Sequence, residues 1–215
     1  MNLVLIRHGQ TDWNREGRFQ GRIDVPLNEV GSQEALALAS RLRDVNVDLI
    51  VSSPLSRALK TAEALAQLNM GMPDLEIWED LAEINHGDWE GLLFEEVLAK
   101  WPDLLRLWRI RPSEVTMPNG ENLDQVAQRA NRAIGVTKDR LSTKDGTVCL
   151  VTHDAVIKVI LCNVLQAPLD SFWRFIIPNA SLTVIRFIEG IPKLALLGDS
   201  NHLNRGFVFS EQRGL

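Results

Sequence analysis

The sequence has few cysteines and no long hydrophobic run, and both absences limit what the protein can be. Its 215 residues include two cysteines, Cys149 and Cys162, and each lies in an apolar stretch. Two buried, reduced thiols explain these positions better than a disulfide or a redox pair. No run reaches the roughly 18 apolar residues of a membrane span, and the opening MNLVLIRHG lacks the basic leader of a signal peptide. We therefore expect a cytoplasmic protein with no membrane partner.

Several patterns that identify other kinds of protein are also missing. There is no GxxxxGK[ST] phosphate loop, no GxGxxG motif and no GxSxG nucleophile elbow. The histidines show neither HxH nor HExxH spacing, and no DxDG-like carboxylate run is present, so we expect no metal site and no cofactor. The net charge is −5 with both signs interspersed, which argues against nucleic acid as a partner. A site for an anionic substrate must then be a local concentration of positive charge.

Short apolar runs alternate with longer segments of helical periodicity, a pattern typical of an α/β sheet with crossover helices. Several expected strands are apolar at consecutive positions, as strands covered on both faces are. The sequence therefore predicts a three-layer sandwich, with a mostly parallel central sheet flanked by helices. The expected strands are 2–6, 48–52, 75–78, 147–152, 181–188 and 193–197, and the expected helices are 32–45, 54–68, 123–141 and 154–165.

Two helix starts and one insertion stand out along the chain. Ser53 and Pro54 have the pattern of an N-cap followed by proline at the first helical position, and Gly31-Ser32 precedes another helical run. Between 84 and 120 the pattern changes to three tryptophans, acidic residues and then PNGEN. We interpret this segment as a helical lid over one edge of the sheet, inside a single domain of residues 1–215. The tryptophans fit a lid core, with substrate platforms as the alternative.

Polar residues follow the ends of several predicted strands, where ligands of open α/β sheets bind. Arg7-His8-Gly9 follows the first strand and His153 follows the fourth, while Arg57 lies in the first turn of the helix after the second. An anion there would be attracted by a helix N-terminus and a guanidinium together. Taken singly, each residue has a plainer explanation, a structural histidine at a strand end or a solvent-facing arginine. Gly9 would let the chain leave the strand, so that Arg7 and His8 could share one ligand.

Acidic residues follow the third predicted strand. Glu79, Asp80 and Glu83 are all candidates for an acid at the same rim. Composition does not choose among them, and most surface carboxylates are only solvated.

Five segments together closely resemble one known family, the phosphoglycerate-mutase-like branch of the histidine phosphatase superfamily. The resemblance extends from Asn2 to about Leu203 and has a highly specific opening block. The segments are LIRHGQTDWN at 5–14, GRFQGRIDVPLNEVG at 17–31, SSPLSRALKTAE at 52–63, EINHGDWEG at 83–91 and VTH at 151–153.

The resemblance implies a metal-independent phosphatase that forms a phosphohistidine. His8 would be the nucleophile, and Arg7, Arg57 and His153 would hold the phosphoryl oxygens. Glu83 would protonate the leaving alkoxide and then activate water, which requires a raised pKa. Residues expected to contact or border the substrate are Asn14, Gln20, Gly21, His86, Asp154 and His202.

One position departs from the pattern of the family. Asp154 stands after the second histidine, where many members have glycine. Its carboxylate would weaken anion binding unless it points away from the phosphate.

The same kind of site serves mutases and phosphatases. Mutases of this family carry ERHYG at the acid, whereas this chain has EINHG and no tyrosine, so we favour a phosphatase. The expected partner is a small phosphorylated metabolite. Phosphoserine is favoured, while α-ribazole phosphate, phosphoglycerates and broad specificity stay open.

Two further questions are left open by the sequence. A non-catalytic phosphate-binding module is the alternative from another class of protein. The apolar residues Phe207, Val208 and Phe209 fit either a partner surface, such as that of a homodimer, or a tail packed on its own domain.

Overall fold

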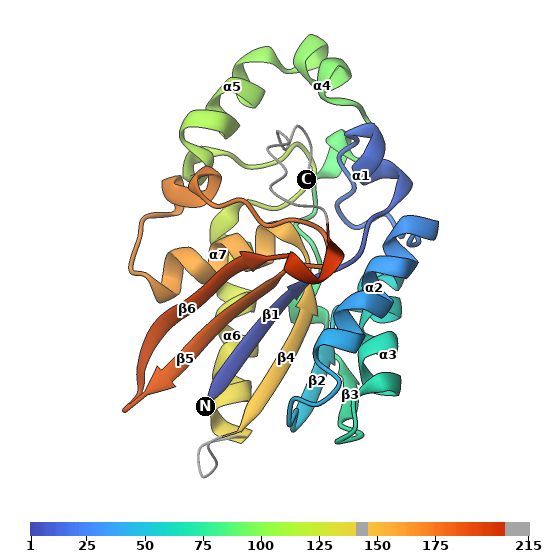
Figure 1. The fold of residues 1–215 in the computed structure, drawn as a ribbon. Helices are drawn as coiled ribbons and strands as arrows, with labels where there is room; N and C mark the ends of the chain where they lie inside the picture. Colours follow the sequence, from blue (N-terminus) through green and yellow to red (C-terminus); the bar gives the residue numbers. More distant parts are fainter. Residues whose placement is uncertain (141–145, 205–215) are drawn as a thin grey trace.

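Six strands form one sheet in the order β3-β2-β4-β1-β5-β6 (Figure 1). The computed structural model describes residues 1–140 and 146–204. Neighbouring strands from β3 to β1 pair in parallel, whereas β5 pairs antiparallel with both β1 and β6. The strands are β1 (Asn2–Arg7), β2 (Leu49–Ser52), β3 (Asp74–Ile77), β4 (Thr147–Thr152), β5 (Leu182–Ile188) and β6 (Ile191–Asp199).

Helices cover both faces of this sheet. Successive side chains of a strand point to opposite faces, so Leu3 and Leu5 of β1 join one core cluster while Val4 and Ile6 join the other. The first cluster lies under α6 (Leu123–Arg140) and α7 (Asp154–Val164), and the second under α2 (Glu29–Arg41) and α3 (Ser56–Leu68). The prediction of a three-layer α/β sandwich with a mostly parallel sheet is confirmed.

The start of α2 differs from the prediction, because the helix begins three residues before Ser32. Asn28 is the N-cap, and its side chain accepts a hydrogen bond of 2.8 Å from the backbone N–H of Gly31. Gly31 is needed for a different reason. A Cβ at this position would lie 2.0 Å from the carbonyl oxygen of Gln10, so only glycine allows the helix to approach the loop that follows β1.

The N-cap predicted at Ser53 is wrong, since α3 begins at Ser56. The Ser53 hydroxyl lies 2.7 Å from Nε2 of His153, which draws this side chain toward β4. The first N–H of the helix is instead satisfied from another loop, because the N–H of Ser56 donates to Oδ1 of Asp24 at 2.7 Å. A sequence-local rule could not identify a cap that comes from so far along the chain.

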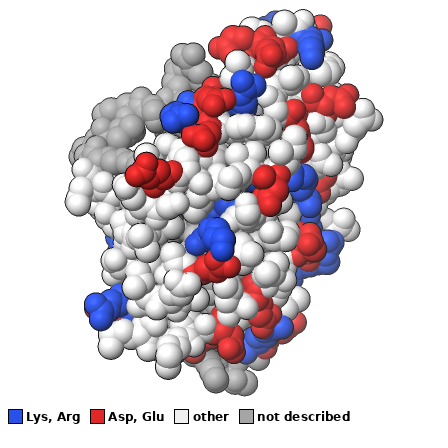
Figure 2. Space-filling model, turned by 90° about the vertical axis from the view of Figure 1, so that its right-hand side faces the viewer, with Lys and Arg blue, Asp and Glu red and all other residues white. Residues whose placement is uncertain are grey.

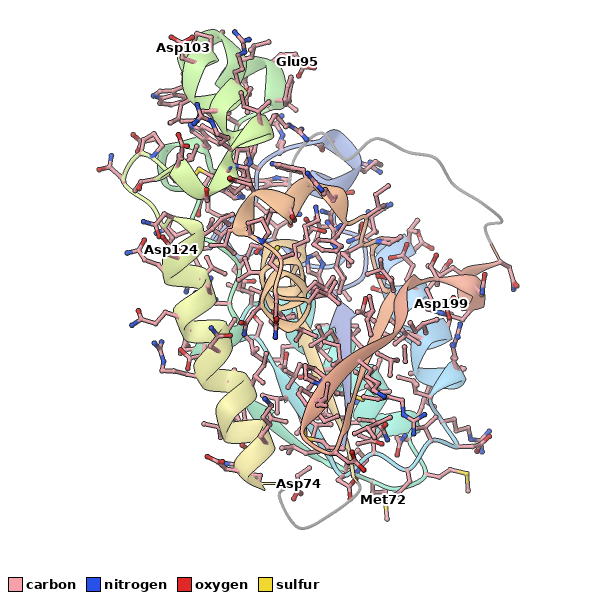
Figure 3. The ribbon with its side chains drawn as sticks, turned by 90° about the vertical axis from the view of Figure 1, so that its left-hand side faces the viewer. Met72, Asp74, Glu95, Asp103, Asp124 and Asp199 are labelled. Carbon is pink, nitrogen blue, oxygen red and sulfur yellow. The ribbon has the colours of Figure 1, made fainter. Side chains whose placement is uncertain are left out.

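The tryptophan-rich insertion forms a helical cap. Its helices α4 (Phe94–Lys100) and α5 (Pro102–Ile110) lie beyond the carboxyl ends of the parallel strands, not along one edge of the sheet (Figure 1). Figure 3 shows its labelled Glu95 and Asp103 at the opposite end of the molecule from Met72 and Asp74. The short 3₁₀ helices η2 (Gly87–Trp89) and η3 (Pro112–Glu114) flank the two helices. Trp89 and Trp108 are fully buried, in agreement with a lid core.

The outer surface bears on the expected partners. Acidic and basic side chains are interspersed over the face shown in Figure 2. Within the described residues, no helix has the length and apolar character needed to cross a membrane. Residues 207–209, for which a partner surface was considered, lie outside the described part of the chain.

Candidate active site

The ends of four neighbouring parallel strands bring five polar side chains to one region. Arg7 ends β1 and His8 follows it, while His153 follows β4. Arg57 lies in the first turn of α3, after β2, and Glu83 follows the short helix η1 (Glu79–Leu81) after β3. None of the five is more than 4% exposed. Charged and polar groups so deeply buried require specific partners or a ligand.

The surroundings of His8 determine its charge and its tautomer. Its Nδ1 lies 2.7 Å from the carbonyl oxygen of Gly9, and because a carbonyl only accepts, Nδ1 carries the hydrogen. Burial, followed by the charges of Arg57 and Arg7, lowers the pKa of His8 well below its usual value. The ring is therefore neutral at pH 7, with its lone pair on Nε2. Such an imidazole nitrogen is a nucleophile.

Gly9 is needed for a steric reason and not for the backbone freedom that the sequence suggested, since it is not among the glycines with positive φ. The strand ends at Arg7, and a Cβ at Gly9 would lie 2.4 Å from the carbonyl oxygen of Gly31. The N–H of Gly9 donates to Oγ1 of Thr61 at 3.2 Å. Close approach of α2 and α3 thus holds the backbone on which His8 lies.

His153 lies directly beside His8. Their ring centroids are 5.0 Å apart with an interplanar angle of 61°. Burial and the charge of Arg57 lower the pKa of His153 well below its usual value, so this ring is neutral as well. His153 is also the N-cap residue of α7, whose N-terminus adds partial positive charge to the region.

Both arginines are held in place by backbone carbonyls. Arg57 donates from Nη2 to Gly21 O at 2.8 Å and from Nη1 to Ile23 O at 3.0 Å. Arg7 donates from Nη1 to Ile177 O at 2.6 Å. Burial lowers the pKa of Arg57 to about 10, which still leaves it charged at neutral pH. Two fixed cations therefore lie near the neutral ring of His8.

Three buried nitrogens of this cluster lack a hydrogen-bond partner among the described residues. They are Nε of Arg7, Nε of Arg57 and Nδ1 of His153. Buried polar groups without partners are rare in folded proteins, and each calls for an explanation. With the Ser53 hydroxyl donating to Nε2 of His153, the hydrogen of that ring is on Nδ1, and a tetrahedral oxyanion among these side chains would provide the missing acceptors.

Burial singles out one of the three candidate acids. Glu79 is exposed and Asp80 pairs with Arg132 at 2.7 Å, whereas Glu83 is only 2% exposed. Burial, and then the negative charge of Asp154, raise the pKa of the Glu83 carboxyl. The group therefore keeps its proton to higher pH than an ordinary glutamate and can act as an acid.

Three of the predicted substrate-contacting residues border this cluster. Oδ1 of Asn14, on α1 (Asp12–Glu16), accepts from Nδ2 of Asn179 at 3.2 Å. Nδ2 of Asn179 also donates to the backbone carbonyl of His8 at 3.2 Å. Oε1 of Gln20 accepts from Thr11 at 2.9 Å, and the carbonyl of Gly21 binds Arg57. All three take part in the polar framework around His8 and Arg57.

Asp154 and His202 have surroundings that differ from the prediction. Asp154 is fully buried and pairs with Arg7 at 3.2 Å, so its carboxylate is occupied by a cation of the protein. His202, on η5 (Asn201–Leu203), lies 3.5 Å from Arg41 of α2. Arg41 also pairs with Asp199, which Figure 3 shows beside that helix. His202 therefore belongs to a surface ion cluster and not to the buried group around His8.

His86, predicted to contact or border the substrate, is fully buried in an aromatic cluster. Its ring centroid is 5.2 Å from that of Phe19, 6.4 Å from Trp89 and 6.3 Å from Trp108. Neither ring nitrogen has a hydrogen-bond partner among the described residues. Burial lowers the pKa of His86 to about 3, so the imidazole is neutral and has one N–H to donate.

This low pKa predicts a loss of stability in acid. Below pH 6.5 His86 becomes protonated in the unfolded chain but stays neutral in the folded chain. The free energy of unfolding therefore decreases as the pH is lowered. Between pH 7 and pH 4.5 the loss from this residue is expected to be roughly 2 to 3 kcal/mol. Urea unfolding of the wild type and of His86→Phe, at both pH values, measures it as the difference between the two pH-dependent losses. Equal losses in the two proteins would contradict this origin.

Several residues of the cluster escaped sequence reasoning. Ser53, Thr61 and Asn179 support His153, Gly9 and His8 through hydrogen bonds from distant segments. Lys158 had a usable signal, since it is the one basic residue in the apolar helix sequence DAVIKVILCNV. Within the described part of the chain, no three His, Cys, Asp or Glu side chains gather as metal ligands would.

Comparison with known proteins identifies the family. The family model of the histidine phosphatase superfamily (branch 1) matches residues 3–200. Phosphoserine phosphatase 1 of Hydrogenobacter thermophilus is 34% identical over 210 residues, covering 97% of each chain. YhfR of Bacillus stearothermophilus has a TM-score of 0.87 at 35% identity, over 94% of this chain and 98% of that one. A phosphoserine phosphatase mutant of Entamoeba histolytica in complex with phosphoserine has a TM-score of 0.80 at 29% identity, over 94% and 98%. The chain belongs to branch 1 of the histidine phosphatase superfamily.

Proposed function

We propose that this phosphatase hydrolyses a small phosphomonoester through a covalent phosphohistidine on Nε2 of His8. One observation carries the proposal. A neutral imidazole with its lone pair on Nε2 lies beside three buried nitrogens, of Arg7, Arg57 and His153, that lack partners within the described residues. A phosphoryl group would satisfy those donors while exposing its phosphorus to the ring.

The first half of the reaction transfers the phosphoryl group to the enzyme. Nε2 of His8 attacks phosphorus, and the bond to the ester oxygen breaks. Glu83 gives its proton to the departing alkoxide, which leaves as the alcohol. Arg7, Arg57 and His153 stabilise the charge on the phosphoryl oxygens, and because the protein already holds them in place, little reorganisation is needed.

The second half returns the enzyme to its starting state. Glu83, now a carboxylate, takes a proton from water, and the oxygen of that water attacks phosphorus. The bond to Nε2 breaks, and inorganic phosphate is released. Glu83 ends protonated and His8 neutral, so the cycle closes without a further reactant.

The proposed substrate is an ester whose alcohol carries a carboxylate, with phosphoserine as the first candidate. The N–H of the neutral His86 imidazole is a donor for such a carboxylate, and it lacks a partner among the described residues. Phosphoserine bound to the similar Entamoeba histolytica phosphatase supports this choice. Asn14, Gln20 and Gly21 would border the bound ester.

Trapping the intermediate tests the mechanism. Wild-type protein is mixed with ³²P-labelled phosphoserine and quenched within milliseconds, and its peptides are then mapped. We expect label that is stable to alkali, labile to acid and located on the peptide that contains His8. Label on a serine or threonine, or turnover without labelled protein, would refute the proposal.

Substrate choice needs a separate comparison. A panel of phosphorylated metabolites, including phosphoserine, both phosphoglycerates and α-ribazole phosphate, is ranked by kcat/KM. Phosphoserine is expected to rank first. Transfer of label to a second phosphoglycerate instead of water would identify a mutase, and binding without turnover would identify a non-catalytic module.

A further inference from the structure

A lysine is buried behind the candidate active site. Lys158 lies in the middle of α7, and its side chain is 1% exposed. Its neighbours along the helix are apolar and buried. Burying an ammonium group is costly unless it is paired, and the proposed reaction assigns no step to it.

Lys158 shares a carboxylate with an arginine of the candidate site. Its Nζ lies 2.7 Å from Oδ2 of Asp154, one helical turn earlier. The other oxygen of Asp154, Oδ1, lies 3.2 Å from Nη1 of Arg7. Asp154 is fully buried, and Arg7 is only 4% exposed. One anion therefore lies between two cations, of which one belongs to the group around His8.

Aromatic rings hold the ammonium group in this position. Nζ of Lys158 lies 5.0 Å from the ring centroid of Phe172 and 4.7 Å from that of Trp173, both on η4 (Leu169–Arg174). The guanidinium of Arg109, on the cap helix α5, lies 4.2 Å from the same indole centroid. These contacts are within the range of cation–π attraction. The lysine is therefore positioned by rings as well as by its ion pair.

The ion pair of Asp154 with Lys158 resolves a conflict at Arg7. A buried carboxylate beside this arginine fixes the orientation of the guanidinium, but alone it would cancel the positive charge that a phosphate needs. A second cation on the carboxylate restores the balance. With Arg7, Asp154 and Lys158 all charged, the three groups together carry one positive charge; without Lys158 they carry none.

We propose that Lys158 is a positioning residue that offsets the charge of Asp154, so that Asp154 can orient Arg7 without weakening its attraction for phosphate. This inference rests on the proposed function, in which Arg7 holds the phosphoryl group. Burial lowers the pKa of Lys158, and Asp154 opposes that shift, in keeping with a mutual dependence of the two groups.

Calorimetric titration of the full chain with inorganic phosphate at pH 7 tests the inference. Lys158→Met removes the charge and keeps a side chain of similar length that suits aromatic neighbours. The Kd for phosphate is expected to rise about tenfold or more in this variant. Asp154→Asn keeps an oxygen for Arg7 and is expected to bind phosphate at least as tightly as the wild type.

The double variant provides the decisive comparison. Asp154→Asn combined with Lys158→Met is expected to return the Kd to within about threefold of wild type, because the charge to be offset is gone. Additive losses in the double variant, or wild-type affinity in Lys158→Met, would overturn the inference. Lys138→Met is the matched control, since this exposed lysine lies 4.5 Å from the ring of Phe187, and its Kd should not change.

Two further readouts keep the outcome unambiguous. Thermal unfolding of each variant shows whether the fold is intact. If Lys158→Met does not fold, Asp154→Asn alone tests the inference. A Kd for phosphate about tenfold higher in Asp154→Asn would contradict it. Phosphate binding needs no turnover. If the Kd values of the three variants contradict the inference while His8 of the protein still becomes labelled, only the role of Lys158 is rejected. Absence of His8 labelling removes the proposed mechanism.

Discussion

The His8→Ala variant is expected to lose about four orders of magnitude or more of kcat, because a covalent mechanism has no route without its nucleophile. Binding should survive, since Arg7, Arg57 and His153 each have supports that do not involve the His8 side chain. Steady-state hydrolysis of phosphoserine measures the first quantity, and calorimetric titration with inorganic phosphate measures the second.

The combination of the two results is what identifies a nucleophile. Lost turnover with retained phosphate affinity supports the proposed role. Loss of both would point to a collapsed site, which thermal unfolding would reveal. Residual activity above about a tenth of wild type would exclude His8 as the nucleophile.

The Glu83→Gln variant is expected to separate substrates by their leaving groups. With phosphoserine, kcat/KM should fall by about 10²- to 10³-fold, because the serine alkoxide is a poor leaving group without a proton donor. With p-nitrophenyl phosphate, the first step should be little affected, since nitrophenolate leaves unprotonated. Hydrolysis of the phosphohistidine should be slow with both substrates, as the base for water is lost.

Rapid mixing distinguishes these steps. With p-nitrophenyl phosphate, Glu83→Gln should release a burst of nitrophenolate equal to the enzyme concentration, followed by slow turnover. With phosphoserine there should be no burst. Glu76→Gln is the control, because it removes a partly exposed carboxylate that pairs with Arg140 on the surface. Equal losses with both substrates in the first step would contradict the acid role of Glu83.

The pH profile provides an independent check on the same residue. The proton on Glu83 is needed for kcat/KM, so activity should fall as pH rises through its raised pKa. At the acidic end, activity should fall only as pH drops through the lowered pKa of His8, where the ring gains a proton. The basic limb for phosphoserine should disappear in Glu83→Gln, and the acidic limb should remain.

The sequence predicted the sheet and its helices because their signals are local. Apolar runs such as those of β1 and β4 are continuous in the chain, and Arg7, His8 and His153 lie at or directly after the strand ends. Parallel neighbours then bring those ends together, so the location of the cluster followed from topology. Composition did not distinguish Glu79, Asp80 and Glu83. Within the sequence only the family resemblance pointed to Glu83, and in the structure the three acids differ in burial.

Long-range contacts decided the remaining features. Asp24 satisfies the first N–H of α3, and Ser53 turns to His153. The cap lies over the strand ends, where its tryptophans and His86 form one aromatic cluster. The contacts of Asp24 with Ser56, of Ser53 with His153 and of His86 with Trp108 each join segments far apart in the chain, and no local pattern encodes such a contact.

By itself, the sequence determined the succession of strands and helices along the chain, the family and the residue types available at the rim of the sheet. These follow from hydrophobic periodicity and from motifs that are continuous in the chain. Only the tertiary structure decided which of those side chains lose water and which partner each one meets. It also turned Asp154 toward Arg7 and Lys158, because burial and charge pairing depend on what packs around a group and not on its neighbours in sequence.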